Sequence, residues 1–196
     1  MARGRVLPTP DFCQALLETY AVNDRLNQLI LEHLDPRAWR ARPTDRQRHP
    51  ARTTTAKNRS PRTIAAIFAH MHNIRRKWLR LSAPHLKLPV QLDRSRCSQQ
   101  QARKALAESA RRCSEMLAEA LGGAEGRIRQ FRRDGWARPW PAGTAMFTYM
   151  IVHDAHHRGQ ICMLAHQMGF PLPTKPSYEM WMWEKIWKQC GFTGVR

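Results

Sequence analysis

Four long amphipathic helical segments, with almost no strand signal between them, constrain what this chain of 196 residues can fold into. In each segment apolar side chains recur every three or four positions, which is the spacing that lines one face of an α-helix. The segments cover residues 10–34, 60–81, 98–121 and 144–168. Because each helix must bury its apolar face against another element, the pattern predicts an all-α fold, a four-helix bundle.

Residues typical of helix ends flank these segments. Ser60 and Pro61 suit the N-cap and the first position of the second helix, and Gly169 suits the stop after the fourth. Residues 123–143 are expected to form a loop. Residues 177–190 are expected to form an extra short C-terminal helix, whose tryptophans pack across the bundle or contact a second copy of the chain.

Polar side chains interrupt two of the apolar stripes. Asn23 and Asn27 fall on the stripe of the first helix, where they lie at its edge or meet polar groups inside the bundle. His153 and His157 fall on the stripe of the fourth helix, which would place their Cβ atoms about 5–6 Å apart on one face. Two imidazoles at this spacing can bind one cation. The alternative is a pair of core histidines whose hydrogen bonds are satisfied within the protein.

Helical geometry separates the other nearby histidines. His156 lies about 100° around the helix from His157 and is expected to be a neighbour, an orienting group or an interface residue. A third ligand must come from another helix, and the second helix offers His70 and His72. These two lie on either side of Met71, about 100° away in each direction, so only one of them can face a given site. The periodicity does not choose between them.

The formal net charge of +18 raises the question of nucleic-acid binding. Residues 37–62 hold eight arginines and one lysine against Asp45. This polar segment with several prolines has no helical stripe and is expected to be a solvated, flexible loop. A phosphate-binding arm is the less favoured alternative, since Trp39 is its only aromatic residue and no nucleic-acid motif is present.

Composition narrows the cellular setting. No apolar run approaches the roughly 18–20 residues that span a bilayer, which argues against a membrane protein. The basic N-terminus is not followed by the apolar region of a secretory signal, and the five cysteines form no CxxC pair. These features predict a cytoplasmic protein with reduced thiols. The length suits a single domain over residues 1–196.

Two separated motifs resemble the DinB-like superfamily. They are Ala69-His70-Met71-His72-Asn73-Ile74-Arg75, with Trp78 and Leu79 after it, and His153-x-x-x-His157-Arg158-Gly159-Gln160. In that superfamily a histidine of the second helix is followed by Asn or Asp three positions later and often by Trp eight positions later, which fits His70, Asn73 and Trp78. The resemblance covers most of the chain, from the first helix to about Pro173.

The resemblance implies a bundle with up-down-down-up connectivity, commonly a homodimer. It also implies a divalent ion, zinc or nickel, held by His70, His153 and His157, with His72 outside the site. Arg158 and Gln160 would then hydrogen-bond outward from the ligands or fix the helix. Members with an assigned activity mostly use a low-molecular-weight thiol as transferases or isomerases. Others are regarded as metal-dependent hydrolases of small molecules, or as damage-inducible proteins without a known reaction.

Three neutral imidazoles leave at least one metal position open, which is typical of a catalytic site. Activation of a water would give hydrolysis, and activation of a thiol would give S-transfer. Asp154 lies about 100° around the helix from His153 and is expected at most to orient a ligand, while Cys162 is expected to be a core thiol. The alternatives are a non-catalytic metal-binding protein of the stress or damage response, and a basic nucleic-acid-associated helical protein.

Overall fold

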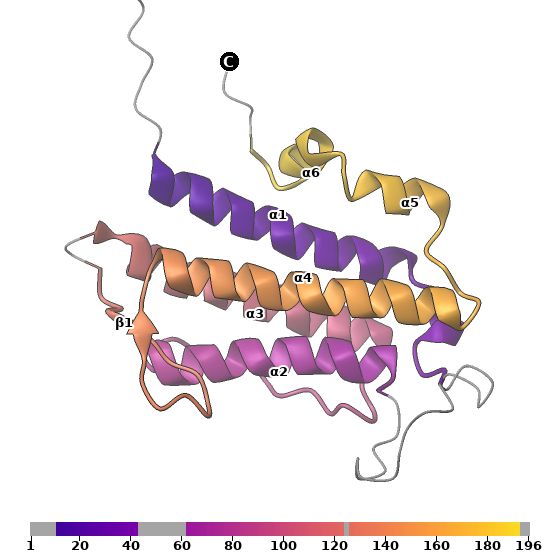
Figure 1. Cartoon of the computed structure of the whole chain (residues 1–196), viewed down its shortest axis with the longest axis horizontal. Coiled ribbons are helices and arrows are strands. Elements are labelled where there is room, and N and C mark those ends of the chain that lie inside the picture. The colour runs from indigo at the N-terminus through magenta and orange to yellow at the C-terminus, as the bar shows by residue number, and fades with distance from the viewer. Residues whose placement is uncertain (1–10, 43–61, 124–125, 193–196) are drawn as a thin grey trace, which may run out of the picture.

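The computed structural model describes residues 11–42, 62–123 and 126–192. Its four long helices form the predicted bundle: α1 Phe12–His33, α2 Ile64–Ser82, α3 Gln99–Leu121 and α4 Thr144–Gln167. α1 and α4 run in one direction while α2 and α3 run in the other, which is the up-down-down-up order (Figure 1). Both α1 and α2 pack against α3 and α4. None of the helices in the described ranges is long and apolar enough to cross a membrane.

A side-chain cap sets where α2 begins. Oγ1 of Thr63 accepts a hydrogen bond from the backbone N–H of Ala66 at 3.2 Å, so the helix starts at Ile64. The prediction that Ser60 would be the N-cap of this helix is therefore wrong. Ser60 and Pro61 themselves lie outside the described residues. The later start still leaves the histidines of α2 two turns inside the helix, where their backbone is regular.

The chain beyond α4 turns back over α1. Gly169 adopts a φ of 82° just after α4, a conformation that favours glycine and ends the helix as predicted. The prediction of one helix over residues 177–190 is wrong, because the segment forms α5 (Thr174–Glu179) and α6 (Trp183–Gln189). The break lets Ile186 enter a buried cluster of apolar side chains from α1, namely Val22, Leu26 and Leu29.

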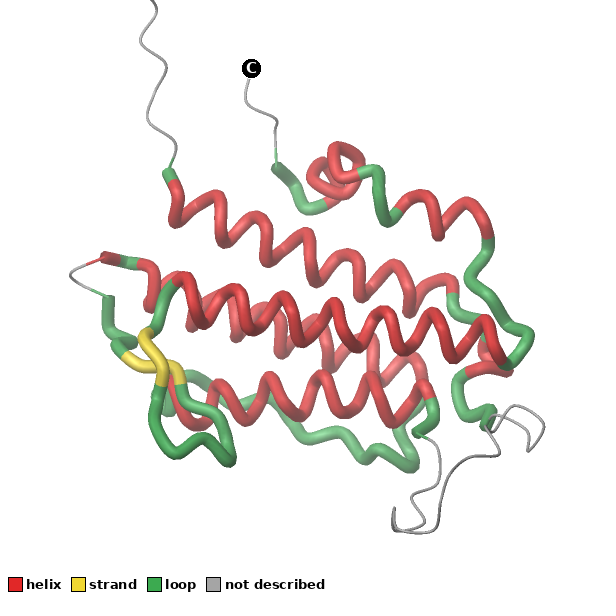
Figure 2. Tube along the Cα trace, in the orientation of Figure 1, coloured by secondary structure: helices red, strands yellow, loops and turns green. Residues whose placement is uncertain are grey.

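The connection between α3 and α4, expected to be a loop, contains a short antiparallel hairpin of β1 (Gln130–Phe131) and β2 (Trp140–Pro141). Phe131 is fully buried and packs edge-on against Trp78 of α2, with 5.9 Å between ring centroids. The hairpin therefore closes the end of the bundle at which α4 begins (Figure 2).

The core contains charged residues that the apolar stripes do not predict. On α4, Asp154 is fully buried, and the side chain of His153 beside it is 12% exposed. On α2, Arg75 is fully buried. Charged groups are almost never buried unless they are paired. The buried face of α4 thus includes Asp154, because that carboxylate has partners on the neighbouring helices.

The basic segment over residues 37–62 starts inside the fold. After a short 3₁₀ helix, Pro36–Ala38, the side chain of Trp39 is buried. Its ring stacks on Phe68 with 5.8 Å between centroids, and its Nε1 donates to the carbonyl oxygen of Cys97 at 3.0 Å. The prediction of a solvated loop is therefore wrong at the beginning of the segment. Residues 43–61 lie outside the described residues.

Candidate metal centre

Three histidines from two neighbouring helices come together between α2 and α4. They are His70 of α2, and His153 and His157 on successive turns of α4. One ring nitrogen of each can be chosen so that all three lie within 4.8 Å of one another. The ring centroids of His157 and His153 are 4.5 Å apart, and those of His157 and His70 are 4.8 Å apart. The packing of α2 against α4 thus joins residues that are far apart in the sequence.

The surroundings keep the imidazoles of His70 and His157 neutral. Burial, followed by the charges that His157 and His153 can carry, lowers the pKa of His70 to about 3. Burial also lowers the pKa of His157 to about 4, although its hydrogen bond with Gln160 opposes the shift. Both rings therefore keep a free lone pair at neutral pH, which is the form that binds a metal ion.

Gln160 fixes the ring of His157. Its Oε1 lies 2.8 Å from Nδ1 of His157. Since an amide oxygen only accepts hydrogen bonds, Nδ1 carries the proton and Nε2 is left with its lone pair. The amide nitrogen of Gln160 donates to Nε2 of the exposed His156 at 2.9 Å. His156 is therefore in contact with Gln160 at the surface and does not join the cluster.

Asp154 stands behind His153. Its Oδ1 lies 3.5 Å from Nδ1 of His153, and neither atom has another polar partner among the described residues. A carboxylate in this position favours the proton on Nδ1 and leaves Nε2 for a metal ion, an arrangement that recurs in metal-binding histidines. The sequence predicted an orienting role at most, and the structure gives Asp154 the geometry for that role.

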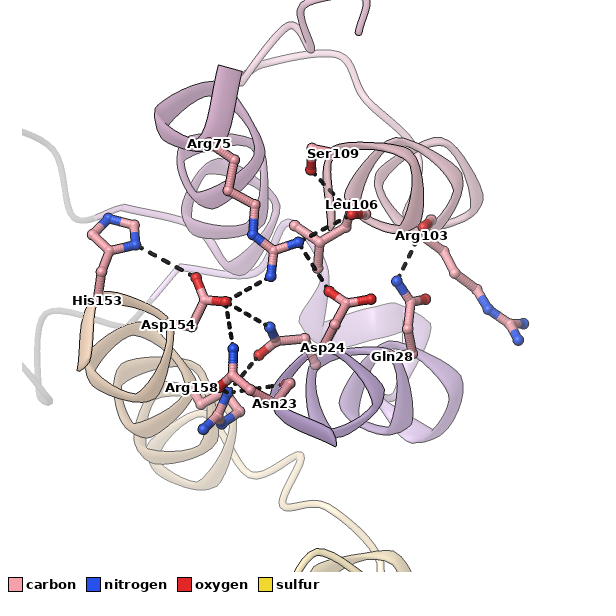
Figure 3. A network of polar contacts seen from close by, with 11 residues as sticks. Asn23, Asp24, Gln28, Arg75, Arg103, Leu106, Ser109, His153, Asp154 and Arg158 are labelled. Atoms are coloured by element: carbon pink, nitrogen blue, oxygen red, sulfur yellow. Dashed lines mark hydrogen bonds and ion pairs between the residues drawn. The ribbon is translucent and has the colours of Figure 1, made fainter. Parts of the chain in front are cut away.

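The other carboxylate oxygen of Asp154 accepts three hydrogen bonds, drawn in Figure 3. The donors are Nδ2 of Asn23 at 2.9 Å, Nδ2 of Asn27 at 3.2 Å and Nη2 of Arg75 at 2.6 Å. The asparagines of α1 thus meet polar groups inside the bundle, one of the two alternatives considered. Burial raises the pKa of Asp154, but the charge of Arg75, the contact with His153 and the hydrogen bond from Arg75 outweigh it and lower that pKa well below its ordinary value.

Arg75 is a fully buried guanidinium that joins all four helices (Figure 3). From α2, its Nη1 donates to Oδ1 of Asp24 on α1 at 2.9 Å and to the carbonyl oxygen of Leu106 on α3 at 3.0 Å. Its Nη2 donates to Asp154 on α4. Burial lowers the pKa of Arg75, but the charges of Asp154, Tyr20 and Asp24 raise it well above the ordinary value. Arg75 and Asp154 are therefore both ionised, and each is the other's counterion.

Arg158 sets the orientation of the two asparagines. From α4, its Nη1 donates to Oδ1 of Asn23 at 2.6 Å and to Oδ1 of Asn27 at 3.0 Å. Because an arginine only donates, both amide oxygens turn toward Arg158 and both amide nitrogens turn toward Asp154. Arg158 therefore acts on the centre through the partners of Asp154.

Aromatic rings bound the cluster on the side of the hairpin. The ring of Trp78 lies 5.1 Å from that of His153 and 5.9 Å from that of Tyr149, between centroids. Trp136, from the loop of the hairpin, packs on Tyr149 at 5.2 Å. These rings exclude water from one side of His153, which strengthens electrostatic interactions there.

His72 and Asn73 of the first motif point away from the cluster. Nε2 of the buried His72 lies 2.8 Å from the carbonyl oxygen of Val90. The Asn73 amide donates to the carbonyl oxygen of Leu92 at 2.9 Å and accepts from the N–H of Leu92 at 3.1 Å. Both residues hold the connection between α2 and α3 against α2. Cys162 is half-buried and packs on the apolar core.

Sequence reasoning missed Arg75 and underrated Asp154. A usable signal was present, since Asn23, Asn27, Arg75 and Asp154 are polar residues placed among the apolar residues of three different helices. Buried polar groups need partners, and polar groups on several inward faces can supply them to one another. The signal does not say which residues meet, because that depends on how the helices are aligned.

Comparison with models of known protein families gives a match. The model of the family described as the DinB family matches residues 14–186, which is most of the chain. No curated protein matches the sequence.

Proposed function

This chain belongs to the DinB family, and we propose that it is a metal-dependent enzyme whose divalent ion, zinc or nickel, is held by His70, His153 and His157. The observation that carries the proposal is the convergence of three imidazoles, with ring nitrogens within 4.8 Å of one another. Two of the rings also have a hydrogen-bonding group behind Nδ1, Gln160 in one case and Asp154 in the other.

The donor set fits a catalytic ion. Three histidines leave at least one coordination position open, whereas structural zinc sites use four protein ligands. A divalent ion in this position would lower the pKa of a thiol or a water that occupies the open position. The residues of the chain would supply a fixed ring orientation, through Gln160 and Asp154, and a wall that excludes water, through Trp78 and Tyr149.

The geometry favours thiol S-transfer over hydrolysis. Hydrolysis gains from a general base beside the attacking water. The carboxylate that contacts the cluster is that of Asp154, and its Oδ2 already accepts hydrogen bonds from Asn23, Asn27 and Arg75. In S-transfer, the sulfur forms a bond to an electrophilic carbon, the thiol proton is released and the leaving group departs with its electron pair. That reaction needs no free carboxylate once the thiol is deprotonated.

The proposal includes a homodimer, as the family resemblance implies. The face of α4 that points away from the bundle exposes apolar side chains, with Val152 and Met163 each 58% exposed. Exposed apolar residues on one face are a common feature of contact surfaces. Light scattering of the full chain would show twice the mass of one chain. A monomer at micromolar concentration would contradict this part of the proposal.

Elemental analysis of the purified full chain tests the metal centre without assuming a reaction. We expect a stoichiometric amount of a divalent ion in the wild-type protein and a loss of most of it in His153→Ala. The matched control is His166→Ala, an exposed histidine near the end of the same helix. A wild-type protein that takes up no divalent ion, or a His153→Ala variant that binds it unchanged, would show that the proposal is wrong.

A panel assay tests the reaction class. The loaded protein is incubated with low-molecular-weight thiols and alkyl halide or epoxide electrophiles, and in parallel with simple esters and amides. Turnover in the thiol arm that His70→Ala abolishes is the expected result. Turnover of esters or amides alone would favour the hydrolase, and turnover in neither arm by a metal-loaded protein would favour a non-catalytic metal-binding protein.

A further inference from the structure

A pocket of about 720 Å³ opens on the side of α2 next to His70. It is lined by α2 and by the connection that follows it, and four of its lining residues are cations: Arg76, Lys77, Arg80 and Arg94. We propose that this pocket is an anion-binding subsite, which holds a carboxylate or phosphate group of the small molecule that reacts at the histidine cluster. The inference rests on the proposed function, since it concerns the substrate of the same centre.

The pocket and the cluster are adjacent. Arg94 lines the pocket, and its Nη2 lies 3.4 Å from Nδ1 of His70. Arg76 follows His70 by six residues on α2, which is roughly 9 Å along the helix axis. A molecule of ordinary metabolite size could therefore reach the cluster with one end and Arg76 with the other. The volume lies within the usual range for small-molecule sites.

Two of the cations, Arg76 and Arg94, have no acidic partner among the described residues. The other two, Lys77 and Arg80, both contact the carboxylate of Asp134, at 2.6 and 3.6 Å. Arg76 contacts only neutral oxygens, those of the Pro89 backbone and the Gln91 side chain. Among the described residues, Arg94 has its hydrogen bond with the neutral ring of His70. Arg76 and Arg94 are thus the guanidinium groups that can bind an added anion.

Asp93, the one acid among the described residues that line the pocket, does not neutralise Arg76 and Arg94. Oδ1 of Asp93 accepts hydrogen bonds from the backbone N–H and the hydroxyl of Ser95, at 2.7 and 2.6 Å, and from the N–H of Arg96 at 3.2 Å. That carboxylate therefore stabilises its own turn. Burial, and then the charge of Arg80, lowers the pKa of Arg76, as expected for cations that crowd one another without an anion between them.

The position of Arg94 also argues for an anion. A guanidinium beside His70 disfavours a divalent cation at the cluster, because like charges repel. Its hydrogen bond to Nδ1 of His70 cannot coexist with a metal ion on that ring. If Nδ1 binds the ion, Arg94 is displaced; if Nε2 binds it, Nδ1 carries the proton and no longer accepts. Metal binding therefore frees Arg94 to meet an anion at the edge of the centre.

Anion titration of the full chain, loaded with zinc, tests the subsite. Sodium sulfate and sodium acetate serve as probes at constant ionic strength, and amide chemical shifts are followed by NMR. Saturable shifts are expected at residues 88–94. Loss of a charge-assisted hydrogen bond should weaken sulfate binding about tenfold in Arg94→Gln, and likewise in Arg76→Gln. The matched control is Arg96→Gln, an exposed arginine two residues further along the same connection, which should bind sulfate as the wild type does.

The outcomes separate the two proposals. Saturation by sulfate alone supports a phosphate-bearing substrate, and saturation by acetate as well supports a carboxylate. Zinc affinity, measured by competition with a chromophoric chelator, should be retained or raised in Arg94→Gln, because His70 is released. If zinc binds but sulfate causes no changes in amide chemical shift, or causes identical changes in Arg94→Gln and Arg96→Gln, the proposal of the subsite is wrong. If sulfate binds as expected but zinc does not, the metal proposal is wrong and the subsite remains.

Discussion

At the scale of single residues, a polar group behind a ring decides which nitrogen a candidate ligand can offer. Gln160 does this for His157, and Asp154 has the position to do it for His153. Arg158 acts indirectly on His153, because it turns the amide nitrogens of Asn23 and Asn27 toward Asp154. Substitutions that leave all three histidines in place should therefore still change metal binding, as is general for residues behind metal ligands.

Asp154→Asn should show this most strongly. The amide keeps the shape of the side chain but removes the charge that faces Arg75 and His153. We expect zinc affinity to fall about 10- to 100-fold. The free energy of unfolding should also fall by about 3–5 kcal/mol, because a fully buried guanidinium loses one of its two carboxylate partners and keeps only the partly exposed Asp24. Chelator competition and urea unfolding measure the two effects.

Asp134→Asn is the matched control for that variant. Asp134 also pairs with a cation, Lys77, but both side chains are more than 40% exposed. Exposed ion pairs contribute little to stability. Zinc affinity and unfolding should therefore stay close to the wild type. An Asp154→Asn protein that behaves like Asp134→Asn would show that the buried carboxylate has no role at the centre.

The neutral histidines also predict how stability depends on pH. Burial lowers the pKa of His70 to about 3 and that of His157 to about 4, against about 6.5 in an unfolded chain. Below pH 6.5 the unfolded chain binds protons that the folded chain does not. The unfolding free energy of chelator-treated protein should therefore decrease as the pH falls from about 6.5 toward 4. Urea unfolding at several pH values measures this slope.

A variant with both titrating groups removed provides the control. In the double variant His70→Gln, His157→Gln, the slope between these pH values should be shallower, with a remainder from the buried His72, whose pKa is also lowered by burial. An identical slope in the two proteins would show that the cluster histidines do not titrate as described.

At the scale of elements, periodicity predicted the four long helices closely, since their bounds depend on local spacing and on caps. It also predicted that His157 lies on the buried face of α4, but it did not predict that Asp154 does. A period of 3.6 residues accommodates His153 or Asp154 about equally well, and hydrophobicity alone excludes a carboxylate from the core. Only the partners on other helices, Asn23, Asn27 and Arg75, make Asp154 the inward residue. The relative alignment of four helices is not encoded in the spacing of any one of them.

The choice between His70 and His72 likewise could not be made from the spacing of one helix. Spacing showed that the two point in different directions and left the choice open. The family motif favoured His70, and the structure brings His70 to the cluster while His72 contacts the Val90 backbone. The short elements were the least predictable. The hairpin and the break between α5 and α6 depend on where Phe131 and Ile186 find buried space.

The packing of α6 on α1 can be tested through Ile186. This side chain is fully buried in the cluster with Val22, Leu26 and Leu29. Ile186→Ala should lower the unfolding free energy by roughly 2–5 kcal/mol, the usual cost of truncating a buried Ile side chain. Trp183→Ala, on the same helix but 45% exposed, is the comparison and should cost much less. Equal effects would show that α6 does not dock through Ile186.

At the scale of the whole molecule, the net charge of +18 works against a compact state. Raising the sodium chloride concentration from about 0.01 M to about 0.15 M shortens the Debye length from about 30 Å to about 8 Å. The Tm should therefore rise over this range, since repulsion between surface cations is screened while the buried pair of Arg75 and Asp154 is not. A Tm that falls with salt, measured by circular dichroism, would mean that the exposed ion pairs dominate instead.

The buried guanidinium of Arg75 has a consequence for synthesis of the chain. A ribosome completes α1, α2 and α3 before it reaches residue 154, and until then Asp24 is the one carboxylate partner that Arg75 has among the described residues. Three docked helices would leave Nη2 of Arg75 without its acceptor in a dry interior. The nascent chain should therefore stay loosely packed until α4 emerges from the exit tunnel, and the last long helix to be made should trigger assembly of the other three.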